Sequence, residues 1–226
     1  MNRLGVLVEG PTELEFVQGL LCPYLATKNV AVWARAFGPS GGGIVQWGRA
    51  LHRICSHLKQ DPTVHVTTFV DYYGLPESWP GRSTASSRPY SERGAHIAQH
   101  LSAEVFAKLG DSWSPSRFIP FVMIHEFETL LFSDPDACAR AWARPEVAPA
   151  LNDVRRQFSN PEEINDSPSS APSKRLLSIF ESLAIGRYVK PLYGNLAVLE
   201  LGMETLVAAC PQFCAWLRRL EGLGTA

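Results

Sequence analysis

Four short apolar runs, separated by amphipathic stretches, constrain the fold of the first half of this chain. They cover residues 3–8, 30–37, 64–70 and 118–124, and the third, VHVTTFV, is rich in the β-branched residues of a central strand. Between the runs, apolar residues recur at helical spacing over about residues 12–25, 44–58 and 92–109. This alternation predicts an α/β fold with a largely parallel sheet flanked by helices.

The second half of the chain lacks such strands. Its apolar residues fall into helical pieces separated by proline-rich breaks, and proline ends helices because it lacks an amide hydrogen. The expected helices are residues 137–143, 146–158, 174–183 and 196–220. We therefore predict an α/β core over residues 1–134 and a helical C-terminal cap over residues 135–226, packed as one compact unit.

Charge and cysteine content restrict the class of protein. The chain of 226 residues has 21 Lys and Arg against 22 Asp and Glu, which argues against wrapping duplex DNA by bulk electrostatics. Its apolar runs are far shorter than the roughly 18 residues that span a bilayer. The five cysteines are odd in number, and we expect Cys210 and Cys214 to pack on the last helix without binding a metal. We expect a cytoplasmic protein with no membrane segment.

Acidic residues follow three of the predicted strands. Glu9 comes after the first strand, Asp71 after the third, and Glu126 with Glu128 after the fourth. Ligands of parallel α/β sheets bind at the carboxyl ends of the strands, and carboxylates gathered there repel one another unless a cation compensates. Mg²⁺ prefers a few carboxylates together with water and phosphate oxygens. The sequence therefore predicts a Mg²⁺ or Mn²⁺ site, although each acid alone is also typical of a strand end or helix cap.

Two further side chains are candidates for this site. Lys174 opens a predicted helix, where its ammonium would offset charge on a transferring phosphoryl group or simply be solvated. His125 adjoins the acids after the fourth strand and would relay protons, bind metal or serve as a structural hydrogen-bonding group.

Residues 74–92 are rich in Gly, Pro and Ser, and we expect a long loop there. The loop carries the aromatic and cationic residues Trp79, Arg82, Arg88 and Tyr90. This mixture suits single-stranded nucleic acid, and a mobile lid is an equal alternative.

Several segments resemble known proteins. EGPTE at residues 9–13 resembles the opening of Toprim-fold proteins, and the wider pattern resembles the DUF4276 family. The matching segments are VEGPTE (8–13), VDYYGLP (70–76), FIPFVMIHEFETLLFSD (118–134), INDSPSSAPSKRL (164–176) and CPQFCAWLRRL (210–220). The resemblance implies a Toprim-like α/β domain, a divalent-metal site and association with ATPases in bacterial defence loci.

The Toprim resemblance also implies roles for single residues. Toprim enzymes use a Glu after the first strand as general acid or base, and an Asp-x-Asp pair after the third strand for Mg²⁺. Glu9 matches the Glu and Asp71 the first Asp, whereas Tyr73 stands where the second Asp is expected. Glu126 and Glu128 would then complete the metal ligands.

These features favour a metal-dependent nuclease that hydrolyses RNA or DNA, acting as the effector subunit of an ATPase-gated anti-phage defence system. The alternative is a non-catalytic Toprim-fold partner or sensor subunit of that ATPase. A phosphohydrolase of nucleotides or small molecules has the same metal requirement and stays open.

Overall fold

The computed structural model describes residues 2–38, 43–111, 113–164 and 170–225. The chain divides into two compact units, Met1–Ile124 with Arg218–Ala226, and His125–Leu217. The first unit contains a parallel sheet flanked by helices, and the second consists of helices, so the predicted α/β class is confirmed. Part of the motif at 164–176, residues 165–169, lies outside the described residues.

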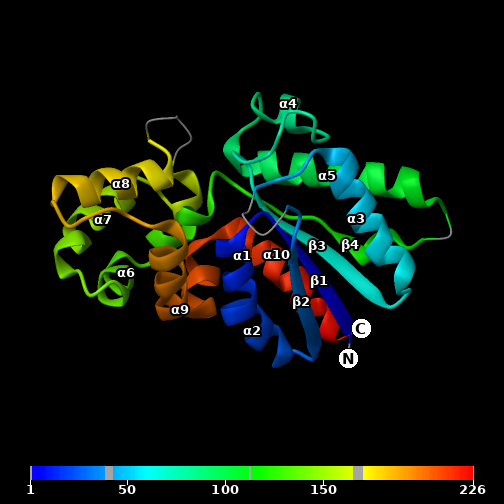
Figure 1. Cartoon of the computed structure of the whole chain (residues 1–226), viewed down its shortest axis with the longest axis horizontal. Coiled ribbons are helices and arrows are strands. Elements are labelled where there is room, and N and C mark those ends of the chain that lie inside the picture. Colours follow the sequence, from blue (N-terminus) through cyan, green and yellow to red (C-terminus); the bar gives the residue numbers. More distant parts are fainter. Residues whose placement is uncertain (1, 39–42, 112, 165–169, 226) are drawn as a thin grey trace. The chain divides into compact units, whose positions relative to one another are not determined.

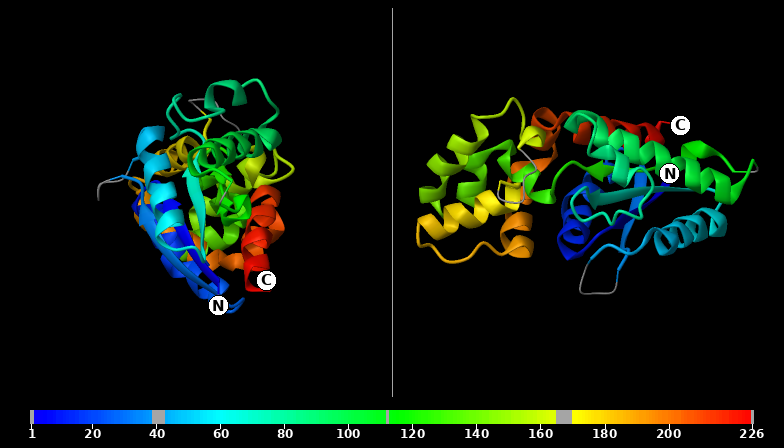
Figure 2. Two further views of the ribbon diagram at one scale, coloured as in Figure 1. Left: turned by 90° about the vertical axis from the view of Figure 1, so that its right-hand side faces the viewer. Right: turned by 90° about the horizontal axis from the view of Figure 1, so that it is seen from above.

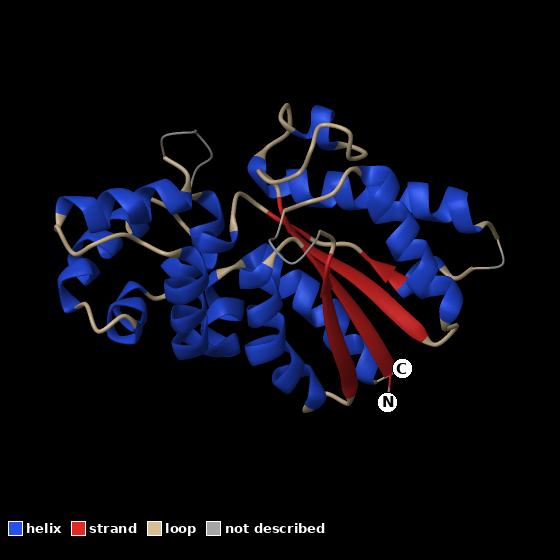
Figure 3. Ribbon diagram, viewed as in Figure 1, coloured by secondary structure: helices blue, strands red, loops and turns tan. Residues whose placement is uncertain are grey.

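The sheet of the first unit has the strand order β2-β1-β3-β4, and β5 also pairs with β3 (Figure 3). Its strands are β1 (Asn2–Val8), β2 (Val30–Ala36), β3 (Val64–Asp71), β4 (Phe118–Ile119) and β5 (Val122–Met123). All the pairs are parallel, and Val8 at the end of β1 lies in register with Ala36 and Phe69. The carboxyl ends of β1 and β3 are therefore neighbours.

Helices cover both faces of this sheet (Figure 1). The helical segments that lie wholly in the first unit are α1 (Pro11–Phe16), the π-helical turn η1 (Val17–Leu21), α2 (Cys22–Ala26), α3 (Trp47–Gln60), α4 (Arg82–Ala85), α5 (Tyr90–Leu109), η2 (Pro115–Arg117) and η6 (Gly222–Gly224). Apolar side chains of α3 and α5 pack with Leu7 and Val66 on one face. On the other face, Phe16 of α1 stacks on Phe69 with ring centroids 5.2 Å apart.

The run at 118–124, expected as one strand, forms the two short strands β4 and β5. Pro120 lies between them and has no amide hydrogen for the sheet ladder. The Thr68 hydroxyl bridges the break, because it donates to the Phe121 carbonyl at 2.8 Å and accepts from the Phe121 N–H at 2.9 Å. A side chain of β3 thus replaces main-chain bonds that proline interrupts.

Helices and 3₁₀ turns make up the described part of the second unit (Figure 2). They are η3 (Phe127–Ser133), α6 (Pro135–Ala141), η4 (Pro145–Val147), α7 (Ala148–Arg155), η5 (Pro161–Glu163), α8 (Pro172–Ser182), α9 (Lys190–Ala209) and most of α10 (Pro211–Glu221). The rings of Trp142, Phe180, Tyr188 and Tyr193 pack together at its centre. Gly202, with φ 69°, kinks α9.

The boundaries of the two units differ from the division expected at residue 134. Residues 125–134 group with the second unit, because η3 buries Leu130 and Leu131 and contacts α9. The last residues, 218–226, group with the first unit, where the Asn2 amide donates to the Leu223 carbonyl.

Among the described residues, no single helix is long and apolar enough to cross a membrane. The bent pair Lys190–Ala209 and Pro211–Gly224, at 100°, meets that length and composition only when taken together.

Candidate functional site

The first and last residues of the EGPTE motif, Glu9 and Glu13, have different surroundings. Gly10 is the N-cap of α1, and its N–H donates to Oε2 of Glu13 at 3.0 Å. Glu13 is buried and stabilises the helix start, as the acid of a capping box does. Glu9 directly follows β1, and it remains the candidate for chemistry.

Asp71 ends β3 and begins a tight turn beside Glu9. Its side chain is buried at 5% exposure, and the turn is closed by the Leu75 N–H, which donates to the Tyr72 carbonyl at 3.3 Å. A Cβ atom on Gly74 would lie 2.5 Å from Oε2 of Glu9, so the carboxylate lies against the glycine of this turn. The structure thus brings Glu9 and the turn at residues 71–74 together at the carboxyl ends of adjacent strands.

Two arginine side chains lie near the aromatic ring of Tyr72, the residue after Asp71. Arg82 is 4.1 Å from the centroid of the Tyr72 ring and donates to its hydroxyl at 3.1 Å, and Arg93 is 5.7 Å from the same centroid. Arg82 also forms an ion pair with the exposed carboxylate of Glu77, at 3.6 Å.

The segment at 74–92 differs from the expected free loop. Trp79 is a core residue at 1% exposure, where its ring packs against Trp47 and its N–H donates to the Val45 carbonyl at 2.9 Å. Its stacking on nucleic acid is thereby ruled out. The segment contains α4 and is anchored by Leu75 and Ala85 in the core.

The predicted metal ligands are divided between the units. Glu9 and Asp71 belong to the first unit, and Glu126, Glu128 and Lys174 to the second. Within either unit, the described residues include no group of three or more His, Cys, Asp or Glu side chains that could hold a metal ion. The grouping of all four carboxylates stays a prediction.

In the second unit, Glu126 and Lys174 lie at the start of α8. Oε2 of Glu126 accepts from the Ser173 N–H at 2.9 Å, in the first turn of that helix. Lys174 is exposed. His125 is buried and has φ 70°, a left-handed conformation that non-glycine residues seldom adopt, which marks this junction as a strained position.

Glu128 forms an ion pair that the sequence did not indicate. The carboxylate is 1% exposed, and its Oε2 lies 3.2 Å from Nζ of Lys190. Burial raises the pKa of Glu128 above its ordinary value, the nearby Glu126 raises it further, and Lys190 opposes both. No sequence period links residues so far apart, and only the tertiary packing of α9 against η3 joins them.

A cavity of about 420 Å³ adjoins this ion pair. Its lining includes Glu128, Ser173, Arg187, Tyr188 and Lys190. Burial, followed by the charge of Glu128, raises the pKa of Tyr188 well above its ordinary value, so the phenol stays protonated. A carboxyl group, a phenol and an ammonium therefore line one cavity of the second unit.

Comparison with known proteins identifies the family. A sequence model described as "Domain of unknown function (DUF4276)" matches residues 8–221. The chain belongs to the DUF4276 family. Neither the comparison with curated proteins nor that with solved structures gives a match. The DUF4276 match includes every predicted site residue, and it confirms the resemblance to that family.

The two C-terminal cysteines of this DUF4276 chain have different environments. Cys210 is fully buried just before α10, and burial raises the pKa of its thiol to about 12. Cys210 is buried as expected but precedes α10, whereas Cys214 lies on α10 and is only half-buried.

Proposed function

We propose that this protein hydrolyses phosphodiester bonds in nucleic acid with Mg²⁺ or Mn²⁺, and that Glu9 and Asp71 form the centre of its site. The observation that carries the proposal is the approach of Glu9 to the turn that Asp71 begins. Carboxylates at neighbouring strand ends are suited to bind a cation and the phosphate that it accompanies.

The donor set suits this cation. Mg²⁺ in proteins is usually bound by one or two carboxylates, with water and phosphate oxygens in the other positions. Glu9 and Asp71 supply two carboxylates, and the absence of a Cβ on Gly74 leaves the space that the Glu9 carboxylate occupies. The family resemblance adds support, because Toprim enzymes use acids at these two positions.

The predicted site residues would divide the work of hydrolysis among them. When bound, the metal would neutralise the phosphate and lower the pKa of water. Asp71 would bind the metal, and Glu9 would accept the proton of the attacking water. Lys174 would stabilise charge on the leaving oxygen, and Glu126 and Glu128 would complete the ligands. Glu128 would first have to leave Lys190, its present partner.

The family resemblance supports a biological setting as well. We place the protein in the bacterial cytoplasm as the effector subunit of an ATPase-gated anti-phage system. Tyr73 at the position of the second Asp favours a second candidate, a non-catalytic partner or sensor subunit of the same ATPase.

The test is to incubate the pure protein with tRNA, single-stranded DNA and duplex DNA in Mg²⁺ or Mn²⁺, with and without the neighbouring ATPase. Glu9→Gln and Asp71→Asn should each abolish hydrolysis while the fold is retained. The exposed Glu104 of α5 provides a matched control, Glu104→Gln. Full activity in both site variants would contradict the catalytic proposal and favour the partner subunit.

A further inference from the structure

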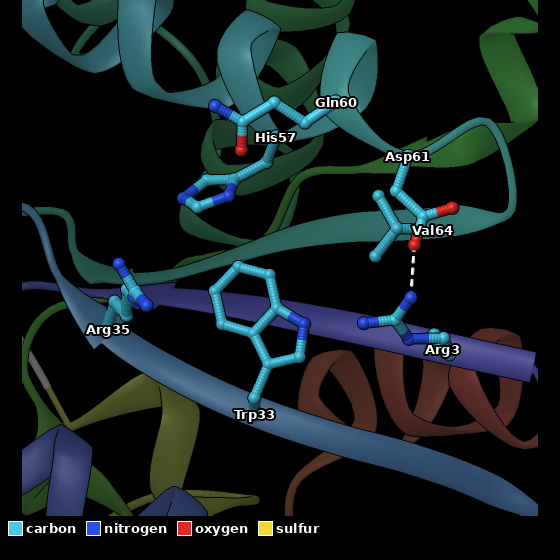
Figure 4. A pocket seen from close by; sticks show the side chains of 7 residues that line it. All are labelled: Arg3, Trp33, Arg35, His57, Gln60, Asp61 and Val64. Carbon is cyan, nitrogen blue, oxygen red and sulfur yellow. Dashed lines mark hydrogen bonds and ion pairs between the residues drawn. The ribbon is translucent and has the colours of Figure 1, made fainter.

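A pocket lies on the α3 side of the sheet, beside the edge strand β2 (Figure 4). Its volume is about 290 Å³, and its polar and aromatic lining is Arg3, Trp33, Arg35, His57, Gln60 and Asp61. All of these residues belong to the first unit. The pocket is separate from the turn that holds Asp71.

The indole ring of Trp33 forms the aromatic side of this pocket, and Gly5 leaves the room that the ring needs. Gly5 pairs with Trp33 across β1 and β2, and a Cβ on Gly5 would lie 2.2 Å from the Trp33 ring. The ring therefore lies directly over the backbone of β1 and stays half-exposed. It points towards His57 of α3, with ring centroids 4.7 Å apart (Figure 4).

Arginines stand on either side of the ring along the strands. Arg3 precedes Gly5 and is ion-paired with Asp61, whereas Arg35 follows Trp33. Arg35 is exposed, its guanidinium is 5.9 Å from the Trp33 ring, and it forms no ion pair with any residue that the structure describes. Burial lowers the pKa of His57, and the charges of Arg35 and Arg53 lower it further, as expected in a positive field.

We propose that this pocket binds one nucleotide of a single-stranded nucleic acid, with the base on Trp33 and the phosphate at Arg35. A half-exposed indole stacks on any base, and a free guanidinium binds phosphate. The bases of a duplex already stack on one another, so only an unpaired base has a free face for Trp33. The volume is near the lower end of ligand pockets, which suits one nucleotide.

The pairing of β1 with β2 indicates where a bound nucleic acid would run. Arg35 of β2 pairs with Leu7 of β1, and Glu9 follows Leu7 by two residues, which is about 7 Å in extended backbone. A strand held at Arg35 would therefore lead towards Glu9. This route depends on the proposed function, whereas binding at Trp33 does not.

The test measures binding without hydrolysis. A fluorescent oligothymidylate of about ten nucleotides is titrated with the full chain in EDTA at low salt, and thymidine monophosphate is the competitor. We expect Trp33→Leu to weaken binding roughly 5- to 150-fold, Trp33→Phe to retain most of it, and Arg35→Ala to weaken it with a shallower salt dependence. The controls are Phe106→Leu and Arg49→Ala, both exposed and outside the pocket.

Three results would overturn the inference. The first is that the wild type does not bind the oligonucleotide. The second is that Trp33→Leu and Arg35→Ala both bind it with an affinity within twofold of the wild type. The third is that thymidine monophosphate binds as tightly as the oligonucleotide. Binding that depends on Trp33, in a protein that cleaves nothing, would support this inference and contradict the proposed function.

Discussion

The carboxylate of Glu9 lies against the backbone of Gly74, so closely that a Cβ atom there would be 2.5 Å from Oε2 and 2.7 Å from Oε1. Parallel pairing of β1 with β3, in register as far as Val8 and Phe69, places these two chain segments side by side. The glycine therefore provides the space that the carboxylate occupies.

Replacing Gly74 with alanine should displace Glu9 more than it unfolds the protein. The atoms in the way are the far end of a flexible side chain, so we expect Gly74→Ala to cost only about 1 kcal/mol in the free energy of unfolding. A misplaced carboxylate should lower hydrolysis about 100-fold. Urea denaturation, hydrolysis rates and Mn²⁺ titration test this.

Gly48→Ala is the matched control, because a Cβ on Gly48 of α3 meets no atom within 4 Å. It should leave activity unchanged. Equal hydrolysis and Mn²⁺ affinity in Gly74→Ala and the wild type would contradict the role of this contact.

The strands could be predicted because their signal is local. The β-branched run expected at 64–70 is β3 (Val64–Asp71), and the neighbourhood of Glu9 and the Asp71 turn follows from the parallel topology. Residues 118–124 were predicted as one strand, so the break at Pro120 was missed, and the Thr68 side chain that bridges it was not indicated by the sequence. That bond depends on the register between two strands.

Tertiary packing determined the features that the sequence did not reveal. The Gly, Pro and Ser content of residues 74–92 correctly suggests irregular backbone, but it says nothing about burial, and Trp79 is in the core. Lys190 is far from Glu128 in the chain, and only the packing of α9 on η3 brings the two charges together.

The hydroxyl of Thr68 should stabilise the folded protein, because it makes two buried hydrogen bonds to the backbone of Phe121. Thr68→Val keeps the shape of the side chain but leaves the N–H and the carbonyl of Phe121 without this partner. We expect a loss of about 1–3 kcal/mol in the free energy of unfolding, measured in urea. Thr84→Val is the control, because water can replace the bonds of the exposed Thr84; equal losses in both variants would contradict the prediction.

Glu162 caps α10 from a distant part of the chain. Its two carboxylate oxygens accept from the N–H groups of Gln212 and Phe213 at 2.8 and 2.9 Å, in the first turn of that helix. Glu162→Ala should cost about 1–3 kcal/mol, and Glu162→Gln less, because the amide keeps one acceptor oxygen. Thermal unfolding measures both. The exposed Glu181 provides the control, Glu181→Ala, and a loss as large there would refute a capping role for Glu162.

The raised pKa of Glu128 predicts a pH dependence of stability. Between the ordinary value of 4.5 and the higher pKa in the folded protein, the folded state holds more protons than the unfolded chain. Stability from this group therefore falls as the pH rises through that window. Glu128→Gln lacks this slope, so its stability relative to the wild type should increase as the pH rises above about 4.5 through that window. Glu181→Gln should run parallel to the wild type, and a parallel profile for Glu128→Gln would contradict the assignment.

Lys190 should matter to stability mainly through the charge of Glu128. Lys190→Met leaves a buried carboxylate without its ammonium, and we expect a loss of roughly 1–3 kcal/mol at neutral pH. The loss is at the lower end because Lys190 is 34% exposed and solvent screens part of the interaction. It should shrink in acid, where Glu128 becomes protonated.

Adding Glu128→Gln to Lys190→Met should then recover most of that loss, because the double variant has no buried charge to leave unpaired. Urea denaturation of the wild type, both single variants and the double variant gives the coupling free energy directly. Arg140→Met breaks the exposed pair of Arg140 with Glu200, and it should change stability by less than about 0.5 kcal/mol. Additive effects of the two changes would show that Lys190 does not act through Glu128. Non-additive recovery would identify the ammonium as the group that keeps Glu128 ionised beside the cavity.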